Sequence, residues 1–449
     1  MSTLKKYIPT LLMLLAAFAL SVLTQSLTLF SVIFNGPLTG FYLAIALLIL
    51  TGLFVARVAP KTTVPVYVWA ILFGIALQAP MKTIIEDQNT LLLLVEFIAA
   101  FILFASGITV PIKNFKKYFA PIAALSLFGT ILSIFIFALV LSYLAGAFGL
   151  MVSALSLIIL AAILSSIDPA SILPTFEHLH FRRPFLKDLA ISESAINDVV
   201  GIIITRFFLI AALGAGTTTI GLTVSSQFSI LFSRTAFDFF AVVIVWGVMI
   251  GMLGAWILKT WGEVIGKRHW SDPALFIAVP IFCYALGSLI PGAGFLAAFV
   301  AGMLYEVHAK AIEVHAFFDS LVDRFLKPIT FVLLGAVVPL SVIALPEIVV
   351  VGAFSAIMFM FVVRPFVVFV SLSPWMFTKK ALLHWREVLF ISFLRETGAI
   401  AAILILYSFA RGLLDVEIIY AIGVWVILYT LILEPPLTPL IAKRLEVVD

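Results

Sequence analysis

Five polar side chains that carry oxygen atoms fall within an otherwise apolar stretch, ISESAINDVVG, at residues 191–201. They are Ser192, Glu193, Ser194, Asn197 and Asp198. In a helix, side chains four residues apart share a face, so Ser194 aligns with Asp198 and Glu193 with Asn197. Hard cations such as sodium take oxygen ligands, whereas soft metals prefer sulfur. The stretch therefore predicts a binding site for a hard monovalent cation on a single helix.

Two further groups of ionisable residues lie where helices are expected to break. Asp168 is followed at once by Pro169, which removes an amide donor, and Arg395 and Glu396 are followed by Thr397-Gly398. Each break taken alone could be a simple packing kink. A matched pair of breaks in apolar helices, one in each half of a chain, instead indicates a transporter binding site.

The two acids of the polar stretch are expected to differ in their partners. A rise of about 1.5 Å per residue places Arg395 at a depth similar to that of Glu193. Arg395 can then neutralise Glu193, so that Asp198 remains the acid that exchanges its ligands. The spacing predicts one structural acid and one working acid.

The amino-acid composition indicates that these polar groups lie in a membrane protein. Of 449 residues, 63% are apolar and 11% are charged, against about 45–50% and about 25% in soluble domains. These values exclude a soluble enzyme, a nucleic-acid-binding protein and a disordered scaffold, and an outer-membrane barrel would need polar residues at alternate positions. We predict an all-α polytopic membrane protein. The single cysteine, Cys283, excludes an internal disulfide, and we expect no cofactor.

Apolar windows predict about 14 (13–14) transmembrane helices within one transporter unit spanning residues 1–449. The first of these spans is expected within residues 1–34. The polar stretch 309–328 predicts an amphipathic cytoplasmic linker helix. The spans are expected at 8–33, 40–57, 64–80, 90–111, 119–146, 149–175, 188–213, 233–258, 272–289, 292–308, 329–346, 347–373, 386–410 and 416–440.

Basic residues predict the orientation. With the N-terminus in the cytoplasm, inner segments hold 21 of the 27 Lys and Arg residues and outer segments hold 3. Positive residues concentrate on the cytoplasmic side of membrane proteins. We therefore expect an even number of spans, with both termini cytoplasmic.

Several other charges fall within or near spans, where an ionisable residue costs at least about 2.5–3.5 kcal/mol at the bilayer centre. Glu96 is expected to neighbour the ion path or to be a buried protonated acid. Arg206 is expected to extend towards the outer surface, and Arg364 to anchor packing or the dimer side. Glu434 is expected at the membrane interface. Asp238 is expected to pair with a nearby arginine, Arg234.

The SSIDP stretch, followed about thirty residues later by ESAIND, resembles the monovalent cation:proton antiporter superfamily. The Asn-Asp pair places the resemblance nearest the electroneutral sodium/proton branch. GFLAAFVAGMLY at 294–305 and PITFVLLGAVV at 328–338 are similar to later core helices of that family. The resemblance covers essentially the whole membrane core.

The resemblance implies roles for individual residues. Asp198 would hold the proton and the cation in turn, and Ser194 would supply a second oxygen to a bound sodium ion. Asp168 and the backbone carbonyl of Ile167 would lie where two broken helices cross. The remaining implied core network is Asn197, Glu193 and Arg395, with Glu96 and Glu396 as uncertain neighbours.

The resemblance also implies an inverted-repeat fold, a homodimer in the cell membrane, and a core drawn mainly from residues 90–213 and 292–440. Because proteins of this shape usually have thirteen spans, residues 1–34 would form an extra N-terminal span. It implies 1:1 electroneutral exchange of sodium, or of lithium, for protons, which would serve pH and sodium homeostasis. Two departures leave the cation open. Ile167 replaces a usual threonine, and Glu396 and Thr397 separate Arg395 from its glycine.

Other functions remain open at this stage. A potassium/proton antiporter or potassium-efflux system of the same fold differs only in the cation. A cation-coupled symporter for an organic anion would need substrate space that the sequence offers little of. An intramembrane aspartyl protease is disfavoured because Asp168 and Asp198 lack a Gly-x-Gly-Asp setting.

Overall fold

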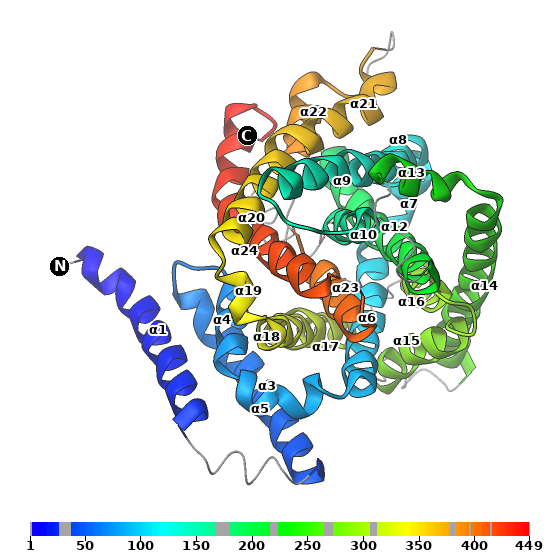
Figure 1. Cartoon of the computed structure of the whole chain (residues 1–449). Coiled ribbons are helices and arrows are strands. Elements are labelled where there is room, and N and C mark those ends of the chain that lie inside the picture. The colour runs from blue at the N-terminus through cyan, green and yellow to red at the C-terminus, as the bar shows by residue number, and fades with distance from the viewer. Residues whose placement is uncertain are drawn as a thin grey trace.

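The fold is a bundle of packed helices (Figure 1). The computed structural model describes residues 2–26, 37–166, 180–215, 223–264, 273–305, 312–377, 382–394, 397–413 and 415–448. Within these ranges no β-strand occurs, and the one β feature is an isolated bridge between Phe181 and Val448. The predicted all-α class is confirmed.

The helices of the first half are α1 (Ser2–Ser26), α3 (Pro37–Val58), η1 (Ala59–Lys61), α4 (Val66–Ala76), α5 (Gln78–Ile85), α6 (Gln88–Thr109), α7 (Ile112–Lys117), α8 (Phe119–Ala123), η2 (Ala124–Gly129), α9 (Thr130–Ala147), α10 (Ala154–Leu164) and α12 (Phe185–Ala215). Those of the second half are α13 (Val224–Phe228), η4 (Ser229–Phe232), α14 (Arg234–Val264), α15 (Pro273–Gly287), α16 (Ala293–Leu304), α17 (Ile312–Leu321), η6 (Val322–Leu326), α18 (Lys327–Val337), α19 (Leu340–Ile343), α20 (Pro346–Met358), η7 (Phe359–Val363), α21 (Arg364–Met376), α22 (Trp385–Ser392), α23 (Ala399–Ala410) and α24 (Val416–Arg444).

Every predicted span overlaps at least one of these helices. Among the described residues, eight helices are long and apolar enough to cross a membrane, and five more are apolar but shorter. The multi-span architecture is therefore confirmed, whereas the count of fourteen stays a prediction.

Only one of the two predicted helix breaks lies within the described residues. Helix α10 ends at Leu164, and the expected break at Asp168 lies outside the described residues. The second break is confirmed, because α22 ends at Ser392 and α23 begins at Ala399 after the extended residue Gly398. Helices α10 and α23 pack against each other, so two short helices meet inside the bundle.

Reciprocal glycine contacts hold two pairs of helices at close approach. A Cβ atom on Gly107 of α6 or Gly302 of α16 would lie 2.1–2.2 Å from a backbone oxygen of the facing helix. On Gly74 of α4 or Gly335 of α18 the same distance would be 2.0–2.1 Å. Only glycine permits backbones this close, and small residues at helix interfaces are the usual device for it in membranes.

Two segments predicted to lie outside the core can be located in the structure. Helix α1 stands to one side (Figure 1), joined to α4 where the Thr24 hydroxyl donates a hydrogen bond to the Ala76 carbonyl oxygen at 2.9 Å. The expected linker 309–328 corresponds to α17 and η6, which continue directly into α18. The buried ring of Phe318 packs edge-on against Phe104. The domain roles assigned to 1–34, 90–213, 292–440 and 309–328 stay predictions.

Replacing Gly302 with alanine tests the glycine contact between α6 and α16. We expect Gly302→Ala to destabilise the detergent-solubilised protein by about 1–3 kcal/mol, because its Cβ would overlap the Phe104 carbonyl oxygen. Gly146→Ala is the matched control, since nothing lies within 4 Å of its Cβ position. Thermal unfolding measures both, and equal midpoints for the two variants would contradict the close-contact explanation.

Candidate functional site

Helix α12 carries the polar stretch, and its first turn is fixed by contacts from other elements. The guanidinium group of Arg183 donates to both carboxylate oxygens of Glu387 at 2.9 and 3.1 Å, just before α12 begins. The side-chain amide of Asn114 donates to the Asp188 carboxylate at 2.6 Å. Hydrogen bonds from α7 and α22 thus fix the start of α12, which precedes its buried polar residues.

All five polar residues of the stretch are buried inside α12. Their relative exposures range from 0 to 3% for Ser192, Glu193, Ser194, Asn197 and Asp198. A helix in this segment was predicted and is observed. Two carboxylates in such an interior carry a high desolvation cost unless each is neutralised or bound to a cation.

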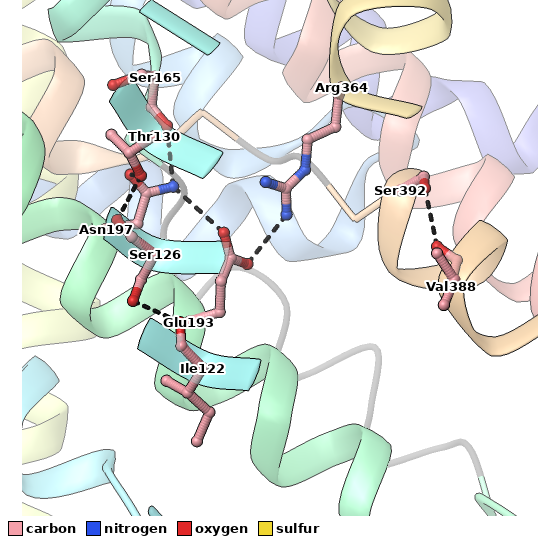
Figure 2. A network of polar contacts seen from close by, with 9 residues as sticks. All are labelled: Ile122, Ser126, Thr130, Ser165, Glu193, Asn197, Arg364, Val388 and Ser392. Carbon is pink, nitrogen blue, oxygen red and sulfur yellow. Dashed lines mark hydrogen bonds and ion pairs between the residues drawn. The ribbon is translucent and has the colours of Figure 1, made fainter. Parts of the chain in front are cut away.

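Glu193 is neutralised by an arginine from the second half of the chain. Its Oε2 atom accepts a hydrogen bond from Nη2 of Arg364 at 3.0 Å, and the two side chains are 3% and 2% exposed. Its Oε1 atom accepts from the Asn197 amide at 3.4 Å. Figure 2 shows both contacts. With both oxygens engaged, Glu193 has the geometry of a structural acid.

Asn197 lies at the centre of a hydrogen-bond network that joins three helices (Figure 2). Its amide nitrogen also donates to the Ser165 carbonyl oxygen at 3.0 Å, at the end of α10. Its amide oxygen lies 2.9 Å from the Thr130 hydroxyl at the start of α9. The network therefore ties the end of the short helix α10 to the helix that carries the acids.

Two residues of this network, the hydroxyl partner of Asn197 and the arginine partner of Glu193, each directly follow a π-helical turn. Thr130 comes after η2 (Ala124–Gly129), and Arg364 comes after η7 (Phe359–Val363). A π-turn adds one residue to a helical turn and changes the direction of the side chains that follow, and such turns are frequent at functional sites. The two turns lie in two long apolar spans, Phe119–Ala147 and Pro346–Met376.

Asp198 and Ser194 form the second stripe of the site. They are four residues apart and are 1% and 0% exposed. Asp198 follows Glu193 by five residues, so at about 100° per residue their side chains leave the helix about 140° apart. One turn further on, a Cβ atom on Gly201 would lie 3.6 Å from Ser166. A carboxylate and a hydroxyl beside the end of α10 can bind a hard cation or a proton.

Four other predicted site residues fall outside the described residues. They are Ile167, Asp168, Arg395 and Glu396, so the predicted pair of Glu193 with Arg395 stays a prediction. Next to the last two, Thr397 is buried and accepts a hydrogen bond from the Thr430 hydroxyl of α24 at 3.0 Å. This bond fixes the described side of the second helix break.

A second ion pair, partly buried, involves the same helix two turns beyond Asp198. The guanidinium of Arg206 donates to Oε1 of Glu96 on α6 at 2.8 Å. The guanidinium carbon lies 4.5 Å from the ring centroid of Phe295 and 4.4 Å from that of Tyr407. Two rings and a carboxylate account for the burial of this charge. The prediction that Arg206 extends to the outer surface is wrong.

Two other predicted charges can be located in the structure. Arg364 was expected to anchor packing or the dimer side, and it is buried and paired with Glu193. Glu434 was expected at the membrane interface; it is 1% exposed within α24, and its depth in the membrane stays a prediction. The predicted pair Arg234–Asp238 is confirmed, with 4.0 Å between the charged groups and both side chains exposed.

Thr130 and Arg364 are the network residues that the sequence interpretation missed. The intramembrane charge of Arg364 was a usable signal, because an arginine within a span needs an acid partner. Thr130 gave no comparable signal. Its position depends on a π-turn, which apolar periodicity does not indicate.

Comparison with known proteins gives the chain a family. The family model described as "Sodium/hydrogen exchanger, transmembrane" matches residues 44–444. A K(+)/H(+) antiporter, NhaP2 of Shewanella oneidensis, is 23% identical over an alignment of 404 residues that covers 88% of this chain. The chain spans 65% of the length of that relative.

Solved structures share the fold. The sodium proton antiporter MjNhaP1 of Methanocaldococcus jannaschii at pH 8 superposes with a TM-score of 0.68 at 20% identity, over 89% of this chain and 99% of that one. An electron-microscopy structure of the same antiporter gives a TM-score of 0.61 at 19% identity, over 89% and 96% of the two chains. At such identities the likeness concerns the fold alone.

Removing the arginine tests the pairing of Glu193. We expect Arg364→Leu to destabilise the protein by about 3–5 kcal/mol, because it leaves a buried carboxylate without its cation. Arg234→Gln is the control, since the exposed pair that it breaks contributes about 0–1 kcal/mol. Thermal unfolding in one detergent measures both. An Arg364→Leu midpoint no lower than that of the control would contradict the pairing.

Proposed function

Since this chain belongs to the sodium/hydrogen exchanger family of membrane transporters, we propose that it exchanges a monovalent cation for protons across a membrane by alternating access. It is a transporter and not an enzyme. The proposed ion site is Asp198 with Ser194, and Asp168 and the carbonyl of Ile167 are proposed to complete it.

The observation that carries this proposal is the difference between the two acids of α12. Glu193 has one carboxylate oxygen on Arg364 and the other on Asn197. Asp198 is buried one turn and a half further along, on the face of Ser194 and beside the end of α10. Glu193 is thus held by the guanidinium group of Arg364, and we propose that Asp198, with Ser194 on the same face, exchanges a cation and a proton.

The cost of burying charge then couples the two ions. An ionised Asp198 without a bound cation is expensive in a membrane interior, whereas a proton or a bound cation removes its net charge. Only the protein with a protonated Asp198 or with a cation bound there should switch between its inward-facing and outward-facing states at an appreciable rate. Each turnover would then exchange one cation for one proton and move no net charge.

Sodium is the proposed cation, with lithium as a second substrate. Carboxylate and hydroxyl oxygens suit a hard ion, and the fold relative MjNhaP1 is described as a sodium proton antiporter. Potassium is the alternative that a specific observation favours, because the sequence relative NhaP2 is described as a K(+)/H(+) antiporter. An organic-anion symporter has no comparable support.

We further propose the cellular setting. The distribution of Lys and Arg supports a position in the cell membrane with both termini on the cytoplasmic side. The active form is proposed to be a homodimer that serves pH and sodium homeostasis.

Asp198→Asn tests the proposed carrier. The variant cannot gain or lose a proton at that position, so cation-driven proton movement in proteoliposomes should fall to the rate of empty liposomes. Asp238→Asn, at a side chain that is 65% exposed, should retain the original rate. Exchange that persists in Asp198→Asn would overturn the assignment.

A panel of sodium, lithium and potassium gradients tests the cation and the stoichiometry in the same proteoliposomes. We expect sodium and lithium to drive proton movement, with rates that do not change when the membrane potential is clamped. A charge-moving cycle would instead feel about 2.3 kcal/mol per charge per 100 mV. Exchange driven by potassium alone would establish the alternative cation, and a voltage-dependent rate would contradict 1:1 exchange.

A further inference from the structure

A large open cavity lies away from the acid network, where α3 ends. Its volume is about 1040 Å³, and its walls come from α3, η1, α4, α17, η6, α18 and α24. The contacts of α18 with α3 and α4 and of α3 with η6 hold these walls together. Figure 1 shows α17 and α18 beside α3 and α4.

The polar part of this cavity is basic. Arg57, Lys61 and Arg324 line it, and all three side chains are exposed. The acid in its lining, Asp323, already pairs with Lys327 at 3.0 Å. Among the described ranges of the chain, no acid forms an ion pair with the three lining cations. The cavity therefore favours an anion, and it disfavours the transported cation.

The rest of the wall is apolar. Its side chains include Leu53, Val66, Phe317, Phe325 and Leu431. Leu53 and Phe317 are 45% and 50% exposed, so this apolar surface stays open beside the basic groups. A small hydrophilic anion would leave the apolar wall unused, whereas an amphiphile would cover both parts.

The cavity also lies at a membrane boundary. The apolar span Gly40–Lys61 ends there, with Arg57 in the last turn of α3 and Lys61 at the end of η1. Headgroups of anionic lipids concentrate at this depth, and basic pockets between transmembrane helices bind them.

We propose that this cavity binds an anionic phospholipid, with its phosphate held by Arg57, Lys61 and Arg324 and an acyl chain along Leu53 and Phe317. Arginine suits the phosphate because its planar guanidinium group can donate two parallel hydrogen bonds. The bound lipid would join the end of α3 to η6 and α24. The proposal is independent of which ion the protein transports.

Lipid retention by the full chain in neutral detergent tests the proposal. Phosphatidylglycerol or phosphatidylcholine with identical acyl chains is added. Native mass spectrometry counts the bound lipid molecules, and thermal unfolding measures how far each lipid raises the midpoint. We expect phosphatidylglycerol to bind and to raise the midpoint. Arg57→Gln/Arg324→Gln should weaken this binding at least tenfold, and the control Lys82→Gln/Arg234→Gln, also at exposed residues, should leave it unchanged.

Two further measurements test whether binding needs both the phosphate and the acyl chain of the lipid. Inorganic phosphate alone should give no shift of the midpoint, and Phe317→Ser should weaken lipid binding while the three cations stay in place. Equal binding of both lipids, equal binding by the two double variants, or a full shift with phosphate alone would each overturn the proposal. Because these outcomes need no transport assay, they stand apart from the proposed antiport.

Discussion

The ion pair between Glu193 and Arg364 is the contact on which the site depends. Both side chains are almost fully buried, and the bond joins the acid-bearing helix α12 to α21 in the other half of the chain. A buried ion pair does little for stability compared with an apolar pair, but loss of one partner is costly. Its value here is positional. It fixes the Glu193 carboxylate in place beside Arg364, one and a half turns before Asp198 on the same helix.

Irregular backbone places the groups that surround α12. A regular helix would satisfy its own amides and carbonyls, whereas a helix end or a π-turn presents them, or the next side chain, to a neighbour. The Ser165 carbonyl at the end of α10 accepts from Asn197, and Thr130 and Arg364 each follow a π-turn. In a membrane such irregularity is tolerated where protein or a bound ion satisfies the exposed groups.

Much of this arrangement could be predicted from particular residues. Burial of ISESAIND follows from its apolar surroundings, and the break before Ala399 follows from Gly398. The partner of Glu193 could not be predicted in the same way. Residue counts give depth in the membrane but not the direction around the bundle, so they did not identify Arg364 as a partner of Glu193, and the predicted contact with Arg395 stays a prediction. The rings around Arg206 come from α16 and α23, which sequence spacing does not bring together.

The central claim is that a cation and a proton compete for Asp198, and proton release on cation binding tests it most directly. Sodium is added to the detergent-solubilised protein in weakly buffered solution, with potassium in parallel, and the released protons are counted against the cations bound. The account predicts about one proton per cation for the original chain and none for Asp198→Asn. Cation binding without proton release, or equal release by the variant, would contradict it.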